Sequence, residues 1–176
     1  MSKPNSKGLI VKVKKIDERA VTPSRAHDTD SGWDLTVIDV HKIKGDTIFF
    51  RTGLQVQPPS GHYFEIFPRS SISELPLMLA NSAGIIDESY TGELIIPIRV
   101  LHPSLGTEPS QYQFPGGLVR MLDSRPPSML EAGKLLISKK PRIAQMILRK
   151  RIDFQLEEVE SLEGTARGDG GFGSTG

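Results

Sequence analysis

One carboxylate in this sequence has surroundings that suit a catalytic base. Asp87 lies in the stretch NSAGIIDESYTGEL (residues 81–94), directly after an Ile-Ile pair and between two glycines. This pattern predicts a β-hairpin that holds the carboxylate at a defined place. An ionised carboxylate held in this way can orient a water molecule as a general base. The same pattern also suits a turn aspartate that bonds its own backbone.

A second stretch carries groups that suit an anion. In FPRSSISEL (residues 67–75), Arg69 can pair with a phosphate and Ser70 can donate its hydroxyl. A short helix after Arg69, capped by Ser70 or Ser71, would add backbone N–H groups that favour anions. A surface arginine followed by an ordinary helix cap would give the same sequence.

Two further stretches offer polar groups. SGWDLTV places Asp34 as a second carboxylate, and PRIAQMI places Gln145 and Arg142 as an amide and a guanidinium. Taken singly, the first suits a turn at a strand edge and the second suits a strand. Neither stretch alone defines a site.

The C-terminal stretch TARGDGGFGSTG (residues 165–176) contains a match to the G-x-G-x-x-G motif. The match lacks the helix that must follow it in a dinucleotide-binding fold, and no lysine follows its last glycine, which excludes a Walker A loop. Glycine backbone N–H groups can still form an anion nest. Arg167 could pair with phosphate oxygens, and Phe172 could stack on a base. A frayed chain end is the alternative.

Short apolar stretches between Gly, Pro and Asp predict an all-β sandwich or barrel. The expected strands cover residues 9–15, 33–40, 47–56, 62–67, 93–100 and 134–140. Pro97, inside one of them, indicates an edge strand or a bulge. Residues 142–162 suit a helix or strands, and the alternation of Ile152, Phe154 and Leu156 favours strand. Residues 103–132, rich in Pro, Gly and Ser, predict a long irregular connection.

Composition excludes several classes of protein. A chain of 176 residues fits one domain. A net charge of +1 argues against a protein whose main function is to bind a polyanion. The absence of cysteine excludes disulfides, thiolate metal sites and cysteine nucleophiles. The four histidines lack the spacing of a zinc site. No apolar run reaches the roughly 18 residues of a membrane span, and we expect a soluble intracellular protein of the cytoplasm or nucleus.

Five stretches, in order, resemble the five sequence motifs of the trimeric deoxyuridine triphosphatases (dUTP diphosphatases): HDTDSGWDL, PRSS, AGIIDESYTGEL, RIAQM and RGDGGFGSTG. The third and fifth motifs carry most of the resemblance. It implies an all-β jelly-roll (β-clip) domain over residues 1–163 that forms a homotrimer with shared active sites. It also implies a flexible, glycine-rich C-terminal arm over residues 164–176 that closes over the substrate.

The resemblance implies hydrolysis of dUTP to dUMP and pyrophosphate with Mg²⁺ on the triphosphate. Such a reaction limits uracil incorporation into DNA and supplies dUMP for dTMP synthesis. By resemblance, Asp87 orients the water for in-line attack on the α-phosphorus, and Tyr90 packs under the deoxyribose and leaves no room for a ribose 2′-hydroxyl. Asp34 resembles an outer-sphere partner of the magnesium waters. No direct contact with nucleic acid or a membrane is implied.

The substrate contacts that the resemblance implies fall into three groups. The uracil contacts are Asn81 and the backbone of Gly84 and Ile86. The phosphate contacts of the body are Arg69, Ser70, Ser71 and Gln145. The arm contacts are Arg167 on the far phosphates, Phe172 on the uracil, Gly173 and Ser174.

The chain departs from the family pattern at a few positions. Trp33 stands where a smaller apolar residue is more common, and Asp169 adds a negative charge close to the expected γ-phosphate. Two other functions stay open. One is the related deoxycytidine triphosphate deaminase, which shares the fold and an RSS element but lacks the FGSTG ending. The other is a regulatory binding protein that acts through residues 103–132.

Overall fold

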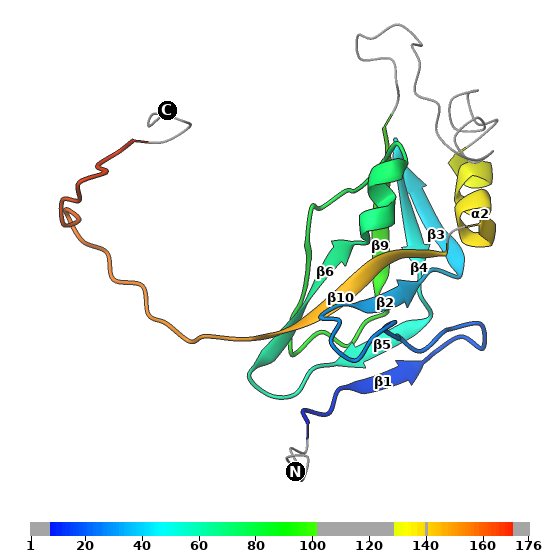
Figure 1. The fold of residues 1–176 in the computed structure, drawn as a ribbon, viewed down its shortest axis with the longest axis horizontal. Coiled ribbons are helices and arrows are strands. Elements are labelled where there is room, and N and C mark those ends of the chain that lie inside the picture. The colour runs from blue at the N-terminus through cyan, green and yellow to red at the C-terminus, as the bar shows by residue number, and fades with distance from the viewer. Residues whose placement is uncertain (1–7, 102–128, 140, 171–176) are drawn as a thin grey trace, which may run out of the picture.

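Two four-stranded antiparallel sheets form the body of the protein (Figure 1). The computed structural model describes residues 8–101, 129–139 and 141–170. The β10 sheet has the order β2 (Trp33–Thr36), β10 (Arg142–Lys150), β6 (His62–Pro68) and β8 (Gly84–Ile86). The β9 sheet has the order β3 (Asp39–Lys44), β4 (Thr47–Arg51), β9 (Ile95–Val100) and β7 (Leu77–Leu79). β1 (Lys12–Lys15) pairs with β5 (Leu54–Gln57) in a small third sheet.

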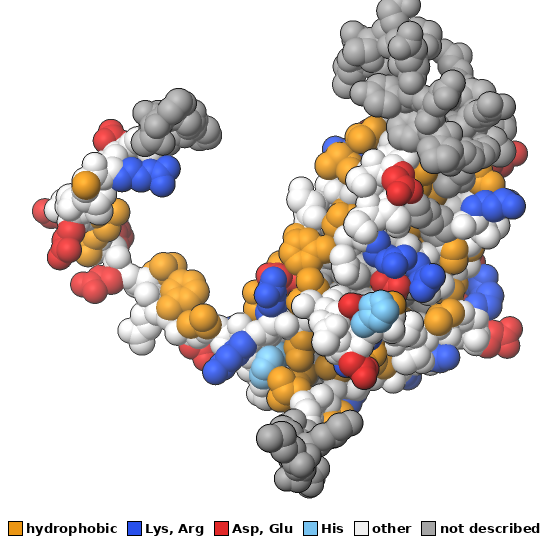
Figure 2. All heavy atoms as spheres, viewed as in Figure 1, with side chains coloured by type: hydrophobic (Ala, Val, Ile, Leu, Met, Phe, Trp, Pro, Cys, Tyr) orange, Lys and Arg blue, Asp and Glu red, His pale blue; other side chains and the backbone are white. Residues whose placement is uncertain are grey.

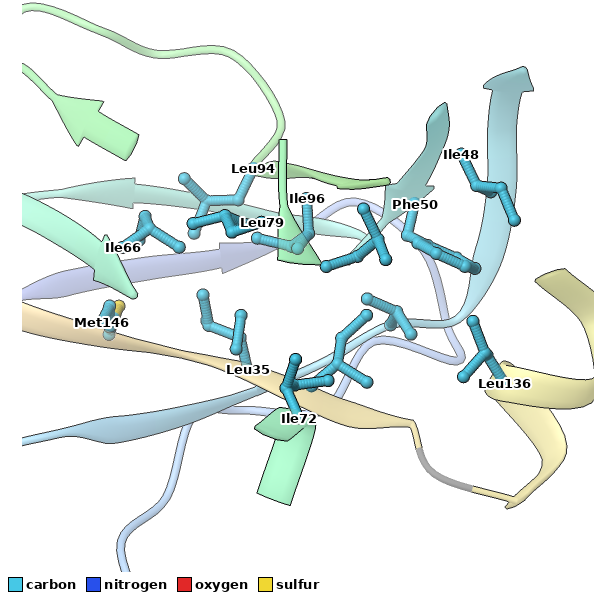
Figure 3. Packing of buried hydrophobic residues seen from close by; sticks show 14 of the residues in the cluster. Leu35, Ile48, Phe50, Ile66, Ile72, Leu79, Leu94, Ile96, Leu136 and Met146 are labelled. Atoms are coloured by element: carbon cyan, nitrogen blue, oxygen red, sulfur yellow. The ribbon is translucent and has the colours of Figure 1, made fainter. Parts of the chain in front are cut away.

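The core lies between the two large sheets. Alternate residues of each strand point inward, as the period of two requires. Leu35, Ile66 and Met146 come from the β10 sheet, and Phe50 and Ile96 from the β9 sheet, and all are at most 4% exposed (Figure 3). This arrangement confirms the predicted all-β class, and it is the jelly-roll that the sequence led us to expect.

A helix covers one end of the core where the sequence predicted a strand. α2 (Met129–Lys139) buries Ala132, Gly133 and Leu136, and Figure 3 shows Leu136 pointing toward the core. The strand expected over residues 134–140 is therefore wrong, because these apolar positions recur at helical spacing. A Cβ at Gly133 would lie 2.8 Å from Cγ2 of Val40, so the glycine lets the helix lie close to β3.

The remaining expected strands are present, but residues 33–40 divide between β2 and β3, and residues 47–56 between β4 and β5, and in each case the two strands belong to different sheets. β10 is a strand, but residues 151–159 have no regular structure, and Ile152, Phe154 and Leu156 are 77–91% exposed. Alternation alone favoured a strand there, yet no neighbouring strand pairs with this segment in the described part of the chain.

Pro97 lies in β9, an inner strand between β4 and β7, so the prediction of an edge strand is wrong. Its carbonyl accepts a bond from the N–H of Ala80 at 2.9 Å, but proline has no N–H to return the bond. The β7 ladder accordingly ends at Leu79. Among the described residues, no helix is long and apolar enough to cross a membrane.

Candidate active site

Asp34 on β2 holds two arginines. Its Oδ1 lies 2.8 Å from Nε of Arg69, and its Oδ2 lies 3.4 Å from Nη1 of Arg142. Arg69 follows β6 and Arg142 begins β10, so the antiparallel pairing of β2, β10 and β6 brings the three side chains together. The N–H of Arg69 also donates to the carbonyl of Ile143 at 3.1 Å. One carboxylate thus orients two guanidinium groups and leaves further donors of each available for an anion.

Gln145 lies beside this group. In the sheet it pairs with Asp34 on one side and Phe67 on the other. Its Nε2 donates to the carbonyl of Pro68 at 3.1 Å. Its amide oxygen faces Gly32, where a Cβ would collide with it. Gly32 is therefore the residue that makes room for the Gln145 side chain.

Asp34, Arg69 and Gln145, but not Arg142, line a pocket of about 330 Å³. Its wall includes Asp34, Arg69, Ser70 and Gln145, as predicted, and also Arg25, which the sequence did not single out. The Arg25 guanidinium lies 4.9 Å from the ring centre of Trp33 and donates to the carbonyl of Asp30 at 3.4 Å. A pocket with several cationic and amide donors suits a phosphate group.

The short helix expected after Arg69 is present as the 3₁₀ helix η1 (Ser70–Glu74). The capping prediction is wrong, since Arg69 occupies the N-cap and no side chain bonds the helix start. Ser70 lines the pocket, whereas Ser71 is partly buried behind it.

The stretch around Asp87 is a connection between the two large sheets. β8 pairs with β6 and ends at Ile86, and β9, which starts at Ile95, pairs with β4 and β7. The predicted hairpin is therefore wrong, because the two strands join different sheets. Asp87 still has a fixed place directly after β8, where its carbonyl accepts a bond from the N–H of Tyr90 at 3.1 Å.

Asp87 lines a second pocket of about 820 Å³ together with Tyr63, Ile85 and Glu88. Within the described chain, no hydrogen bond or ion pair engages the Asp87 carboxylate. Glu88 differs, since its Oε2 accepts from the N–H of Gly61 at 2.9 Å and from Arg151 at 3.1 Å. The bond from Gly61, and after it one from the Ser60 hydroxyl, lowers the pKa of Glu88. Asp87 is thus the carboxylate of this pocket that is open to a water molecule.

The predicted uracil contacts lie close together on the same stretch. A Cβ on Gly84 would lie 3.4 Å from the side-chain amide nitrogen of Asn81, which places that amide against the Gly84 backbone. Asn81 lines a separate pocket together with Lys44 and Arg99. The Ile86 side chain packs against the core, so only its backbone is available for a base.

The Asp34 and Asp87 pockets lie apart, and no described residue lines both. β2 and β8 are the two edges of the β10 sheet, three strand spacings of about 4.8 Å from each other, or about 14 Å. They are also offset along the strands, because Gln145 pairs with Phe67 whereas Ile86 pairs with Phe64. The structure therefore separates the predicted site residues of the body: Asp34, Arg69, Ser70 and Gln145 line one pocket and Asp87 another, while Asn81 and Tyr90 line neither.

The C-terminal segment leaves the body after β10 and runs away from it (Figure 1). Arg167 lies in a turn of this segment, where its Nε donates to the carbonyl of Gly170 at 2.9 Å and Gly168 has a φ of 52°. The structure does not bring Arg167 to either pocket. The predictions for Phe172, Gly173 and Ser174, and most of the 103–132 connection, lie outside the described residues.

The sequence matches the family model for dUTPase over residues 18–102 and 130–176. This chain belongs to the dUTPase family. It is 31% identical over 168 residues to the deoxyuridine 5′-triphosphate nucleotidohydrolase of Clostridium acetobutylicum, covering 94% of this chain and 96% of that one. It is 34% identical over 171 residues to the enzyme of the same name from Mycobacterium leprae, covering 93% of each.

Solved dUTPases have a similar fold. A mutant dUTPase of Staphylococcus bacteriophage 80alpha with dUpNHpp superposes with a TM-score of 0.67 at 23% identity, over 95% of this chain and 98% of that one. A mutant dUTPase of phage phi11 of S. aureus, described with a structural Mg(II) ion, has a TM-score of 0.61 at 21% identity, over 88% and 99%. The dUTPase match leaves out residues 103–129, which agrees with a connection longer than the family pattern.

Asp34 could face a magnesium ion carried by a substrate, because it lines the pocket with Arg69 and Gln145. Each oxygen of Asp34 accepts from one arginine, which leaves further lone pairs that could accept from a water of the ion. The described residues contain no cluster of three or more His, Asp or Glu side chains that could hold a metal. Mg²⁺ commonly keeps several waters and binds substrate phosphates, which is consistent with an outer-sphere role of Asp34.

Sequence reasoning missed two residues that shape the dUTPase site. Arg25 was not singled out, although it precedes the first motif, because a single arginine carries no spacing signal. Gly32 was quoted within SGWDLTV without a role. A glycine directly before a strand could have indicated Gly32, because a glycine near a strand often marks a place where another group approaches the backbone closely.

Proposed function

We propose that this protein hydrolyses dUTP to dUMP and pyrophosphate. The observation that carries the proposal is the pocket in which Asp34 orients Arg69 beside Gln145, with Arg142 paired to the other oxygen of Asp34. In a member of the dUTPase family, such a set of fixed donors suits the phosphates of the nucleotide. Catalysis of phosphoryl transfer depends mainly on positioning the reacting groups and stabilising the negative charge on the phosphate oxygens. These donors can do both.

In the proposed reaction Asp87 is the base. Its carboxylate accepts a proton from a water molecule, whose oxygen forms a bond to the α-phosphorus. The bond from that phosphorus to the oxygen bridging to the β-phosphate breaks, and pyrophosphate leaves. The open carboxylate of Asp87 supports this role, because a base must lie within hydrogen-bond reach of the proton that it takes. Mg²⁺ bound to the triphosphate would neutralise part of its charge, with Asp34 reaching the metal's waters.

Each active site would combine parts of different subunits in a homotrimer. The separation of the Asp34 and Asp87 pockets supports this arrangement, since one subunit would supply the phosphate pocket and another Asp87 with Tyr90. The apolar side chains Ile152, Phe154, Leu156 and Leu162, which are 77–91% exposed, support it too, and Figure 2 shows hydrophobic side chains along the segment that leaves the body. Apolar surface of this extent commonly marks a contact with a partner. The arm of residues 164–176 would then close over the nucleotide as a lid.

The proposal is tested by incubating the purified protein with dUTP and Mg²⁺ and measuring pyrophosphate and dUMP. We expect both products in equal amounts. Incubation with dCTP tests the deaminase alternative, because that reaction releases ammonia and leaves the triphosphate intact. Ammonia from dCTP without pyrophosphate from dUTP would contradict the proposal.

Gly32→Ala is expected to raise the KM for dUTP. The added Cβ collides with the amide oxygen of Gln145 and displaces that side chain from the pocket. Loss of a hydrogen bond to a charged group costs about 1.5–3 kcal/mol, so KM should rise about tenfold to a hundredfold. The measurement is steady-state hydrolysis of dUTP over a range of concentrations. Gly8→Ala is the matched control, because no described atom lies within 4 Å of a Cβ there. An unchanged KM in Gly32→Ala would remove Gln145 from the phosphate site.

A further inference from the structure

The ring of Tyr90 is held by the backbone that follows it. Its hydroxyl donates to the carbonyl of Glu93 at 2.9 Å. The phenol lies against Gly92, where a Cβ would collide with the Tyr90 oxygen. The ring is 42% exposed, so little side-chain packing fixes it. The orientation of Tyr90 therefore depends on where residues 92 and 93 lie.

Glu93 is in turn bound to the turn between β4 and β5. Its Oε1 accepts from the N–H of Gly53 at 2.7 Å, and its Oε2 accepts from Nε of Arg51 at 3.1 Å. The Glu93 side chain is only 16% exposed. Its hydrogen bond is the main cause that raises the pKa of Arg51. Through these two bonds, the segment between β8 and β9 that contains Tyr90 is attached to the turn between β4 and β5.

The turn is closely packed against neighbouring side chains. Gly53 has a φ of 69°, and a Cβ there would lie under 3.0 Å from side-chain atoms of Ile38, Ala20 and Asp17. Arg51 also pairs with Asp17 at 3.4 Å. The Glu93 side chain therefore binds this closely packed turn. Its bonds to Gly53 and Arg51 restrict the position of the Glu93 backbone, including the carbonyl that accepts from Tyr90.

We propose that Glu93 is a positioning residue which, by binding Gly53 and Arg51, holds the carbonyl that orients Tyr90 and so sets discrimination between deoxyribose and ribose nucleotides. This inference rests on the proposed function, in which Tyr90 packs under the sugar. Glu93 does not touch the substrate in this account. It acts through Tyr90.

The test compares kcat/KM for dUTP with kcat/KM for UTP in the full-length protein. Glu93→Ala should lower the dUTP-to-UTP ratio about tenfold, because the carbonyl loses its support. Glu93→Gln should lower the ratio less than Glu93→Ala, since its amide oxygen still accepts from the Gly53 N–H although its NH₂ cannot accept from Arg51. Asp39→Ala is the matched control, because it removes a carboxylate opposite Arg51 in the β3–β4 ladder that binds Arg19 rather than Gly53 or Tyr90. A wild-type ratio in Glu93→Ala, even with both rates reduced, overturns the inference.

A double-mutant cycle separates positioning from a general structural effect. Tyr90→Phe removes the hydroxyl that bonds the Glu93 carbonyl, and it should lower the ratio on its own. If Glu93 acts through Tyr90, the double variant Glu93→Ala/Tyr90→Phe should lower the ratio no further than the stronger single variant. Additive losses would mean that the two residues act independently, which overturns the inference.

A spectroscopic readout keeps the inference testable if the proposed function fails. Wild-type protein that does not hydrolyse dUTP would refute the function but not the Glu93–Tyr90 coupling. Aromatic NMR signals of Tyr90 should then shift or broaden most in Glu93→Ala, less in Glu93→Gln, and not at all in Asp39→Ala. Unchanged Tyr90 signals in Glu93→Ala would refute the coupling itself.

Discussion

Asp87→Asn is expected to lower kcat for dUTP by a factor of about 10²–10⁴, the contribution typical of a positioned general base. An amide can still bond a water molecule but cannot take its proton. Asp87 lies on the surface of its pocket and takes no part in the core, so the fold should survive. The measurement is pyrophosphate release at saturating dUTP, with thermal unfolding recorded for the same sample.

Glu88→Gln is the matched control for this experiment. Glu88 lines the same pocket, but its carboxylate is already engaged by Gly61 and Arg151. We expect this variant to change kcat far less than Asp87→Asn. If Asp87→Asn turned over dUTP at the wild-type rate, another group would have to be the base.

Removal of residues 165–176 should lower kcat/KM for dUTP by about 10²–10³, a loss similar to that of a group that stabilises charge in the transition state. Ordering about ten residues costs roughly 10 kcal/mol or more of backbone entropy. Stacking of one aromatic ring returns only about 1–3 kcal/mol. Contacts of Arg167 and the backbone N–H groups with phosphate must therefore supply much of the remainder.

The same deletion should leave the melting temperature nearly unchanged. Residues 165–169 are exposed, so their loss uncovers no buried surface of the chain. Asp169→Ala is the control within the arm, and it should not lower activity, because it removes a negative charge close to the expected phosphates. A deletion variant with full kcat/KM would contradict the role of the arm as a lid.

Much of the fold could be predicted from alternation, because a half-buried strand leaves a period of two in the sequence. β6 was found in this way, whereas residues 142–150 suited a helix as well as the strand that they form. The same signal failed for Ile152, Phe154 and Leu156, which alternate but have no neighbouring strand in the described chain. Alternation indicates that one face of a segment is apolar and must be buried. It does not show whether the same chain or a partner subunit buries that face.

The site was harder to predict because its geometry depends on which strands become neighbours. Arg69, Asp34 and Arg142 were candidates one by one, but only the order β2-β10-β6 brings them into contact. Asp87 seemed to lie in a hairpin, since two apolar stretches flank a turn. Local sequence cannot distinguish that arrangement from strands that enter opposite sheets.

The most direct test of the account is a crystal structure of the protein with Mg²⁺ and a dUTP analogue whose bridging oxygen after the α-phosphorus is replaced by NH. We predict a trimer in which Asp87 of one subunit bonds a water in line with the α-phosphorus. Arg69 and Gln145 of a neighbouring subunit should bind the phosphates of that same nucleotide. A nucleotide bound far from Asp87, with that carboxylate facing bulk solvent, would contradict the account.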